Sequence, residues 1–234
     1  MKTTQTEIKR VILDRAPLLQ CAHGGVKGRS VISNARPHVG KEALLALDIK
    51  DCFPSITPAL VEGVFERLGF EGEAAKVLVL LTTFKFQLPQ GAPTSPALAN
   101  LALRGIDIRV IGLARQQGFF YTRYVDDLAV SGRRRLKKFL RLHEKIVRTE
   151  GFRLKSKKPL MFQNEPQVIT KLVVNQKVNL PRSKRAAIQK EAMEQAKAGR
   201  NKVSKSTLGK IAWAKLINAP FGIRLLERLR RVSK

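Results

Sequence analysis

The sequence predicts an α+β fold, in which helices cover an antiparallel sheet and a further group of helices follows. Three observations predict this arrangement. A short apolar run that begins at Ala43 and ends in the acid Asp48, and two more runs between residues 118 and 132, have the length of buried strands. Longer segments between and after them repeat apolar residues at helical spacing. The chain has 234 residues, 44% of them hydrophobic, which is enough for a buried core.

The helices that follow the first strand begin at capping signals. Thr57 and Pro58 combine a capping side chain with a proline at the first helical position, and this helix is expected to end at Gly69. A second helix is predicted over residues 71–84, where apolar residues recur at helical spacing. The two predicted helices lie between the first strand and the Pro/Gly loop at Gly91.

Longer helices are predicted in the middle of the chain. Ser95, followed by a proline, repeats the capping signal and opens a predicted helix to about residue 117. Apolar residues then recur at helical spacing from Leu136 to Val147, and Gly151 ends that helix.

The last third of the chain is predicted to be a short hairpin followed by basic helices. The hairpin is expected within residues 168–180, which are rich in Val and Leu with turn residues among them. Basic amphipathic helices are predicted over residues 183–197, 207–216 and 222–231. The order of all these elements favours an α+β body with a helical appendage.

Two adjacent acids, Asp126 and Asp127, lie inside an apolar stretch and are expected at the tip of a strand pair. Removing a carboxylate from water costs roughly several kcal/mol of free energy unless another group compensates its charge. A divalent metal ion would compensate it, although an Asp pair is also ordinary turn chemistry. Asp48 ends the apolar run that begins at Ala43, so a second strand is expected to deliver another carboxylate from its end.

The order of three segments resembles the palm of a reverse transcriptase. An acid-bearing strand ends at Asp48, a Pro/Gly loop with Gln90 and Gly91 runs into a helix, and the Asp126–Asp127 hairpin follows. The resemblance implies a right-hand polymerase with a ferredoxin-like antiparallel sheet plus helices. It places partial fingers at residues 1–42, a palm at 43–175 with a helical insertion at about 58–90, and a basic helical thumb at 176–234.

The resemblance also implies a site for two Mg²⁺ ions. In the family, the first Asp and the first of the adjacent pair are the principal ligands, which correspond to Asp48 and Asp126, with Asp127 supporting. Two such ions activate the primer 3′-hydroxyl and stabilise the leaving pyrophosphate in nucleotidyl transfer. Mg²⁺ prefers carboxylates together with substrate phosphates over a closed protein cage.

Further residues match nucleotide-binding positions of the family. Phe53 corresponds to the aromatic that lies under the sugar and favours dNTPs, although a core aromatic is the alternative. Asp51 lies where the backbone approaches the triphosphate, or is a solvated turn acid. Gln90 and Gly91 match the loop that contacts the incoming nucleotide, or form only a loop before a helix. Lys158 matches the lysine that protonates pyrophosphate, within a charge run that is usually solvated.

The charge of the chain indicates a polyanionic partner. Residues 1–131 contain 16 Lys and Arg against 12 Asp and Glu, a net charge of +4. Residues 132–234 contain 29 against 6, a net charge of +23. We therefore expect the second half to hold nucleic acid. The candidate contacts to RNA or an RNA–DNA hybrid are Arg123, Lys171, Arg182, Lys184 and Arg185.

Other segments resemble the bacterial retron group of reverse transcriptases. Asn34, Ala35 and His38 match its Asn-Ala-x-x-His signature, and residues 121–124 run into the Asp pair as they do there. The group's Val-Thr-Gly triplet reads Ile-Thr-Lys over residues 169–171. The group implies a structured noncoding RNA as template and primer, a branched RNA–DNA product, a role in defence against phage and possibly an effector protein. The alternatives are an RNA-binding module that has lost turnover and a group II intron-type enzyme.

Family members carry an N-terminal fingers segment with a basic residue that grips the triphosphate. This chain is expected to begin inside the helix that follows that segment, so Lys27 or Arg29 is the candidate to substitute.

The remaining polar and aromatic residues are predicted to be structural. His23, His38 and His143 match no metal-ligand spacing, and Cys21 and Cys52 form no disulfide framework. Free thiols, the absence of a signal peptide and the absence of an apolar run of about 18 residues predict a cytoplasmic protein that does not enter a membrane.

Overall fold

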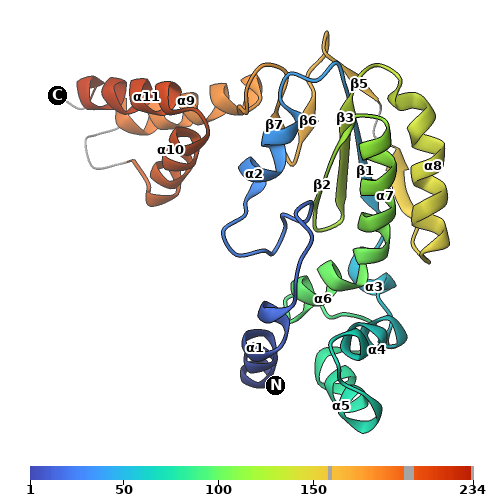
Figure 1. The fold of residues 1–234 in the computed structure, drawn as a ribbon. Helices are drawn as coiled ribbons and strands as arrows, with labels where there is room; N and C mark the ends of the chain where they lie inside the picture. The colour runs from blue at the N-terminus through green and yellow to red at the C-terminus, as the bar shows by residue number, and fades with distance from the viewer. Residues whose placement is uncertain (158–159, 198–202, 233–234) are drawn as a thin grey trace.

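The computed structural model describes residues 1–157, 160–197 and 203–232 (Figure 1). Its main sheet is antiparallel, with strand order β2-β3-β1-β4 and with β5 also paired to β1. The strands are β1 (Ala43–Ile49), β2 (Phe120–Tyr124), β3 (Asp127–Gly132), β4 (Leu154–Lys157) and β5 (Met161–Phe162). The predicted fold class, an antiparallel sheet with helices, is confirmed.

The central strand β1 is apolar along most of its length because both faces of the sheet are covered. Leu45 and Leu47 belong to one apolar cluster, which includes buried residues of α7 (Arg104–Gln116) and α8 (Leu136–Thr149). Leu44 belongs to a second cluster on the opposite face. Alternate residues of a strand point to opposite faces, so this strand separates two cores.

Several segments before and between the strands form the lower part of the molecule in Figure 1. The lower part contains α1 (Lys2–Val11), η1 (Leu13–Arg15), α3 (Cys52–Ser55), α4 (Pro58–Arg67) and α5 (Gly72–Thr82). The helices α2 (Val31–Ala35) and η2 (Arg36–His38) lie higher, against the sheet and the small hairpin. The Thr57 side chain accepts a hydrogen bond from Leu60 N, which confirms the predicted cap of α4. The Gln5 amide donates to the Leu81 carbonyl over 2.9 Å and joins α1 to α5.

The helix predicted from Ser95 to about residue 117 is two helices, so the prediction of one continuous helix was wrong. α6 (Ser95–Ala102) ends at Leu103, whose φ of −80° and ψ of 1° break the helical path before α7. The sequence offers one weak local signal for the break, Gly105 in the first turn of α7. Leu103 is completely buried, so tertiary packing sets the bend. Ser95 also does not cap: its hydroxyl donates to the Pro89 carbonyl over 2.7 Å.

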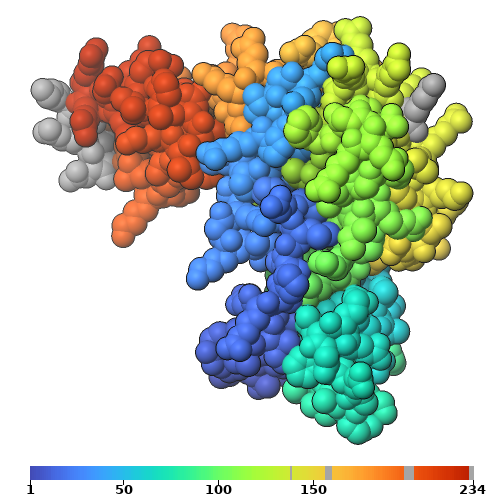
Figure 2. Space-filling model, viewed as in Figure 1, coloured from blue at the N-terminus to red at the C-terminus, as the bar shows by residue number. Residues whose placement is uncertain are grey.

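The C-terminal helices are attached to the sheet through a small hairpin. β6 (Val168–Ile169) and β7 (Leu172–Val173) form the predicted hairpin, and α9 (Arg182–Lys197), α10 (Lys205–Ile217) and α11 (Ala219–Val232) follow. The second apolar cluster runs from Leu44 through Leu172 to Ile188 and Ile211. Figure 2 shows the surface hollowed between these three helices and α1. Within the described part of the chain, no helix is both long and apolar enough to span a bilayer.

The turn of the β6–β7 hairpin has two residues in the left-handed region, Thr170 with φ of 44° and Lys171 with φ of 66°. A two-residue turn with both φ values positive is the type I′ geometry, which favours Asn-Gly. Lys171 occupies the position where glycine is favoured, so its Cβ makes the turn strained.

Replacing Lys171 with Gly is predicted to stabilise the protein by about 1 kcal/mol, because Gly adopts this conformation without the Cβ clash. The midpoint temperature of thermal unfolding should rise by about 2–4 °C for a chain of this length. Lys171→Ala is the matched control, since it removes the same charge and keeps the Cβ. The prediction would be contradicted if the unfolding temperature of the Gly variant were no higher than that of the Ala variant.

His143 lies in the core between α8 and β2, where its ring meets Tyr121 and Phe139 edge-on at centroid distances of 6.0 and 5.9 Å. Neither ring nitrogen has a hydrogen-bond partner among the described residues. Burial lowers the pKa of His143 to about 4, against an opposing effect of Asp107. The fold favours the neutral ring, so this contribution to stability is complete above about pH 6.5 and is lost as the pH falls toward 4.

His143→Phe is predicted to raise the free energy of unfolding at pH 7 by about 1 kcal/mol, because two unsatisfied buried nitrogens are removed. The free energy should also fall less steeply with acid, since this histidine contributes up to about 1.4 kcal/mol per pH unit. Chemical denaturation of both proteins at pH 7 and pH 5 separates titration from packing. Equal losses between the two pH values would show that His143 is not kept neutral by the fold.

Candidate active site

The two adjacent acids lie at the tip of the β2–β3 hairpin, as predicted. Tyr124 pairs with Asp127 across the two strands, which leaves Val125 and Asp126 as a two-residue turn. Val125 has a φ of 58°, in the left-handed region that a β-branched residue rarely adopts. The turn therefore has a conformation that its own sequence does not favour, and contacts from other segments must hold it.

Strand register brings Asp48 beside this turn. Asp48 of β1 is the direct cross-strand partner of Asp127 in β3. Both follow the alternation that places Leu44 and Ala129 in the second apolar cluster, so their side chains leave the same face of the sheet. The Ile49 amide donates to the Asp126 carbonyl over 3.0 Å, which ties the end of β1 to the turn. All three acids are half-buried at one end of the sheet.

The chain reverses sharply after β1. Asp51 has a φ of 45° and its carbonyl accepts from the Ser55 amide over 2.8 Å, which starts the short helix α3. Cys52 is buried behind the acids, and burial together with the Asp126 charge raises its pKa to about 12. It is a neutral thiol that belongs to the core, in agreement with its predicted packing role.

The predicted metal ligands meet, but not as a closed cluster. No group of three or more His, Cys, Asp or Glu in the described ranges is arranged to hold a metal ion. Asp48 and Asp127 supply two carboxylates in register on one face. Mg²⁺ binds through one or two carboxylates and takes its other ligands from water and substrate phosphates, so the residues present fit such an ion.

A cavity of about 480 Å³ lies beside the acids, between the hairpin of β2 and β3 and the hairpin of β6 and β7. Tyr124, Asp127 and Lys171 line it, so the structure brings Lys171 to the acidic end of the sheet. Val31, Met161 and Val168 make part of the lining apolar, and Asp127 and Lys171 bring opposite charges to it. The predicted contact of Lys171 with nucleic acid stays a prediction.

The prediction that Arg123 contacts nucleic acid was wrong. Arg123 is completely buried and forms an ion pair with Asp107, which is 1% exposed. Its Nε and Nη2 donate to the two Asp107 oxygens over 2.9 and 2.7 Å, and its Nη1 donates to Asn100 and to the Val125 carbonyl. Burial alone would lower the pKa of Arg123, but Asp107 raises it above the ordinary value. The guanidinium is a structural cation with no access to solvent.

The other predicted site residues are placed as follows. Phe53 is half-buried against the first apolar cluster, so the core alternative holds for part of its surface. Gln90 and Gly91 lie in an exposed loop, where Gly91 has a φ of 82°. Arg182 and Lys184 are exposed at the start of α9, whereas Arg185 is half-buried there. Lys158 lies outside the described residues.

Lys27 and Arg29, the two candidate cations near the N-terminal end of the chain, differ in their contacts. The Arg29 guanidinium donates through Nη1 to the carbonyls of Leu19, Gln20 and Ala22, so it binds the loop that precedes it. Lys27 is exposed and lies in the same loop. Arg29 therefore has a structural role, and Lys27 is the exposed cation of the two.

The predicted structural histidine of the Asn-Ala-x-x-His signature is built into the sheet. His38 is fully buried, and its two ring nitrogens lie 2.6 and 2.8 Å from the hydroxyls of Ser131 and Thr122. Burial lowers the pKa of His38 to about 3, so the ring is neutral. This residue joins η2 to β2 and β3, on the face that bears the acids.

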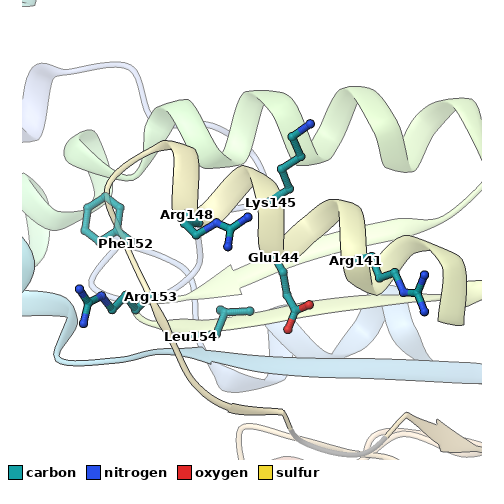
Figure 3. Close-up of a pocket in the computed structure, with 7 residues that line it drawn as sticks. All are labelled: Arg141, Glu144, Lys145, Arg148, Phe152, Arg153 and Leu154. Atoms are coloured by element: carbon teal, nitrogen blue, oxygen red, sulfur yellow. The ribbon is translucent and has the colours of Figure 1, made fainter.

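A basic groove on α8 was missed by sequence reasoning. Four cations and one acid surround a cavity of about 340 Å³ whose remaining lining is Phe152 and Leu154 (Figure 3). The groove is lined by Arg141, Glu144, Lys145, Arg148 and Arg153. The signal was present, because positions 141, 145 and 148 repeat at helical spacing on one face of α8. The groove lies on the helix-covered side of the sheet, away from α9–α11 in Figure 1.

Comparison with known proteins identifies a family. The family model for reverse transcriptase (RNA-dependent DNA polymerase) matches residues 2–171. The chain is 34% identical to the retron Mx65 reverse transcriptase of Myxococcus xanthus, over 97% of this chain and 58% of that protein. It is 38% identical to the retron Ec86 reverse transcriptase of Escherichia coli, over 79% of this chain and 59% of that protein. The chain therefore spans less than two thirds of the length of these relatives.

Solved structures show the same fold. Telomerase from Candida albicans, in a complex with a fragment of telomeric RNA, matches with a TM-score of 0.52 and 9% identity. The match covers 82% of this chain and 42% of the telomerase chain. At this identity the likeness concerns the fold alone, and it confirms the predicted right-hand polymerase class.

Proposed function

This chain belongs to the reverse transcriptase family, and on that premise we propose that it catalyses RNA-directed DNA synthesis. The observation that carries the proposal is the cross-strand pairing of Asp48 with Asp127 at the turn that holds Asp126. Carboxylates from two adjacent strands, half-buried beside an open cavity, are the arrangement that nucleotidyl transfer requires.

Asp48 and Asp126 are proposed to hold two Mg²⁺ ions, with Asp127 supporting them. When bound, such ions activate the primer 3′-hydroxyl and stabilise the charge of the leaving pyrophosphate. The protein's own contribution is orientation: the hairpin fixes one acid pair, and the register of β1 fixes Asp48 beside it. Half-burial lowers the local dielectric and strengthens the attraction between these acids and a cation.

The nucleotide is proposed to bind between the acids and the loop at Gln90 and Gly91. Gly91 has a positive φ and open space where a Cβ would lie, which supports a close approach of the backbone to a ligand. Asp51 and Phe53 follow β1 directly at a sharp reversal of the chain, which supports the proposal that they lie near the triphosphate and the sugar. The half-buried ring of Phe53 supports a preference for dNTPs through exclusion of a 2′-hydroxyl.

The template and primer are proposed to be a structured noncoding RNA, as the retron relatives suggest by family likeness. An RNA–DNA hybrid is the product, and defence against phage, possibly with an effector protein, is the proposed role. The net charge of +23 over residues 132–234 supports a polyanionic partner. The alternatives are an RNA-binding module without turnover and a group II intron-type enzyme. The cross-strand pairing of Asp48 with Asp127 favours an active polymerase over an RNA-binding module without turnover, because it keeps two carboxylates together at the proposed site.

Asp126→Asn is predicted to abolish DNA synthesis and to leave RNA binding nearly unchanged. The change removes one carboxylate charge at the turn but leaves the cations of the C-terminal helices. Primer extension in Mg²⁺ and RNA binding are measured together. Asp14→Asn, at an exposed acid paired with Lys9, is the control. Equal extension rates for wild type and Asp126→Asn would refute the metal assignment, and inactive wild type would support the binding module.

The start of α9 is predicted to hold the RNA–DNA hybrid. Reversing the charges of Arg182, Lys184 and Arg185 should lower affinity for a short hybrid and flatten its salt dependence. Each lost phosphate contact removes about 0.9 units of slope on a log–log plot for duplex DNA, and about 0.7 for single strands. Binding is measured at several salt concentrations.

The control for this experiment is the basic groove of Figure 3. Reversal of Arg141, Lys145 and Arg148 changes the charge by the same amount on the helix-covered side of the sheet. A hybrid bound at the catalytic face predicts that this control keeps its affinity and slope. Equal losses from both triple variants would show that net charge, rather than the position of α9, decides binding.

A further inference from the structure

The turn that carries the acids is held from inside the protein. The left-handed Val125 leaves its carbonyl pointing to the core, where Arg123 Nη1 donates to it over 2.9 Å. The same nitrogen donates to Asn100 Oδ1 over 2.9 Å. A planar guanidinium offers several donors in a fixed geometry, so one side chain can bind the turn and α6 at once.

Asp107 fixes the guanidinium in turn. Its two oxygens accept from Nε and Nη2 of Arg123, and Oδ1 also accepts from the Tyr121 hydroxyl over 2.8 Å. The arginine and the carboxylate are both buried, so neither can move to solvent without leaving an uncompensated charge behind. The position of α7 therefore determines where the Arg123 fork points.

A second segment holds the turn from the other side. Asn100 Nδ2 donates to the Gly24 carbonyl over 2.9 Å. A Cβ at Gly24 would lie 2.5 Å from the Val125 side chain and backbone, so only glycine permits this approach. The backbone of Arg123 exchanges hydrogen bonds of 2.7 Å with Cys21 and His23 on the same segment.

We propose that Arg123 is a positioning residue for the acidic turn: its contact with Val125, oriented by Asp107 and Asn100, sets Asp126 and Asp127 relative to Asp48. This inference rests on the proposed polymerase function. The link to Asp48 is the Ile49 amide, which binds the Asp126 carbonyl at the end of β1. A merely structural ion pair would serve stability, whereas a positioning pair also serves the geometry of the carboxylates.

The test separates these two roles by replacing the charges without opening a cavity. In Asp107→Leu with Arg123→Met, apolar side chains replace the buried pair, a change that is often neutral for stability. The donor to Val125 is lost. We expect an unfolding temperature near that of wild type, unchanged hybrid binding and a kcat lower by roughly 100-fold, the scale of a misplaced reacting group.

Two single variants complete the series. Arg123→Lys keeps the charge opposite Asp107 but loses the fork, so it should fold and show an intermediate loss of kcat. Asn100→Ala removes the second partner of Nη1 and the bond to Gly24, and it carries the test if the double variant does not fold. Arg109→Gln is the matched control. Arg109 lies on α7, as Asp107 does, and the change breaks its ion pair with Glu150 near the surface.

A binding measurement makes the result independent of turnover. Mn²⁺ binding, followed by electron paramagnetic resonance, should weaken about tenfold in the double variant and stay unchanged in Arg109→Gln. Folded variants with wild-type kcat and wild-type Mn²⁺ affinity would overturn the positioning role. If the wild-type protein makes no DNA, weaker Mn²⁺ binding in the double variant than in the wild type would still support the positioning role, while the proposed polymerase function would be refuted.

Discussion

The buried pair of Arg123 and Asp107 is the interaction on which the candidate active site depends. An arginine without solvent contact persists because its planar head donates two hydrogen bonds that the Asp107 carboxylate accepts. The pair locks β2 against α7, and its remaining donor reaches the turn at Val125. Strand, helix and turn therefore form one rigid unit. The acids inherit their position from that unit rather than from the hairpin sequence, which places a β-branched residue where a turn prefers glycine.

Local chemistry was sufficient for much of the fold. The Thr57 cap, the hairpin at the two acids and a buried strand that carries Asp48 near its end follow from residue types and spacing, and the structure has them where they were predicted. Arg123 was misread because it was judged by its neighbours along the chain. Its alternation with Tyr121 placed both on the inward face of β2, but the partner Asp107 comes into reach only through the bend at Leu103. Gly105 is a weak local signal near that bend, and the complete burial of Leu103 shows that tertiary packing contributes to it.

The site itself could be predicted as a set of residues but not as a geometry. The order of Asp48, the glycine loop and the Asp pair along the chain was enough to predict which acids form the site. The structure then shows that Asp48 and Asp127 are cross-strand partners. Whether Asp126 turns toward them depends on backbone angles that spacing does not encode. Charge shows the same division. The excess of cations after residue 131 indicates a polyanion, yet only the fold separates the start of α9 from the groove on α8, which lies on the other side of the sheet.

The second apolar cluster has a consequence for how this protein can be divided and recombined. It begins under β1 with Leu44, passes through Leu172 in the small hairpin and ends among the C-terminal helices at Ile211. A shortened chain that stops near residue 175 would expose this whole surface, including the floor beneath the acids. The three helices are thus not an interchangeable module. A chimaera made with a relative would have to exchange the hairpin and the facing residues of β1 together with the helices, so that both halves of one core come from the same parent.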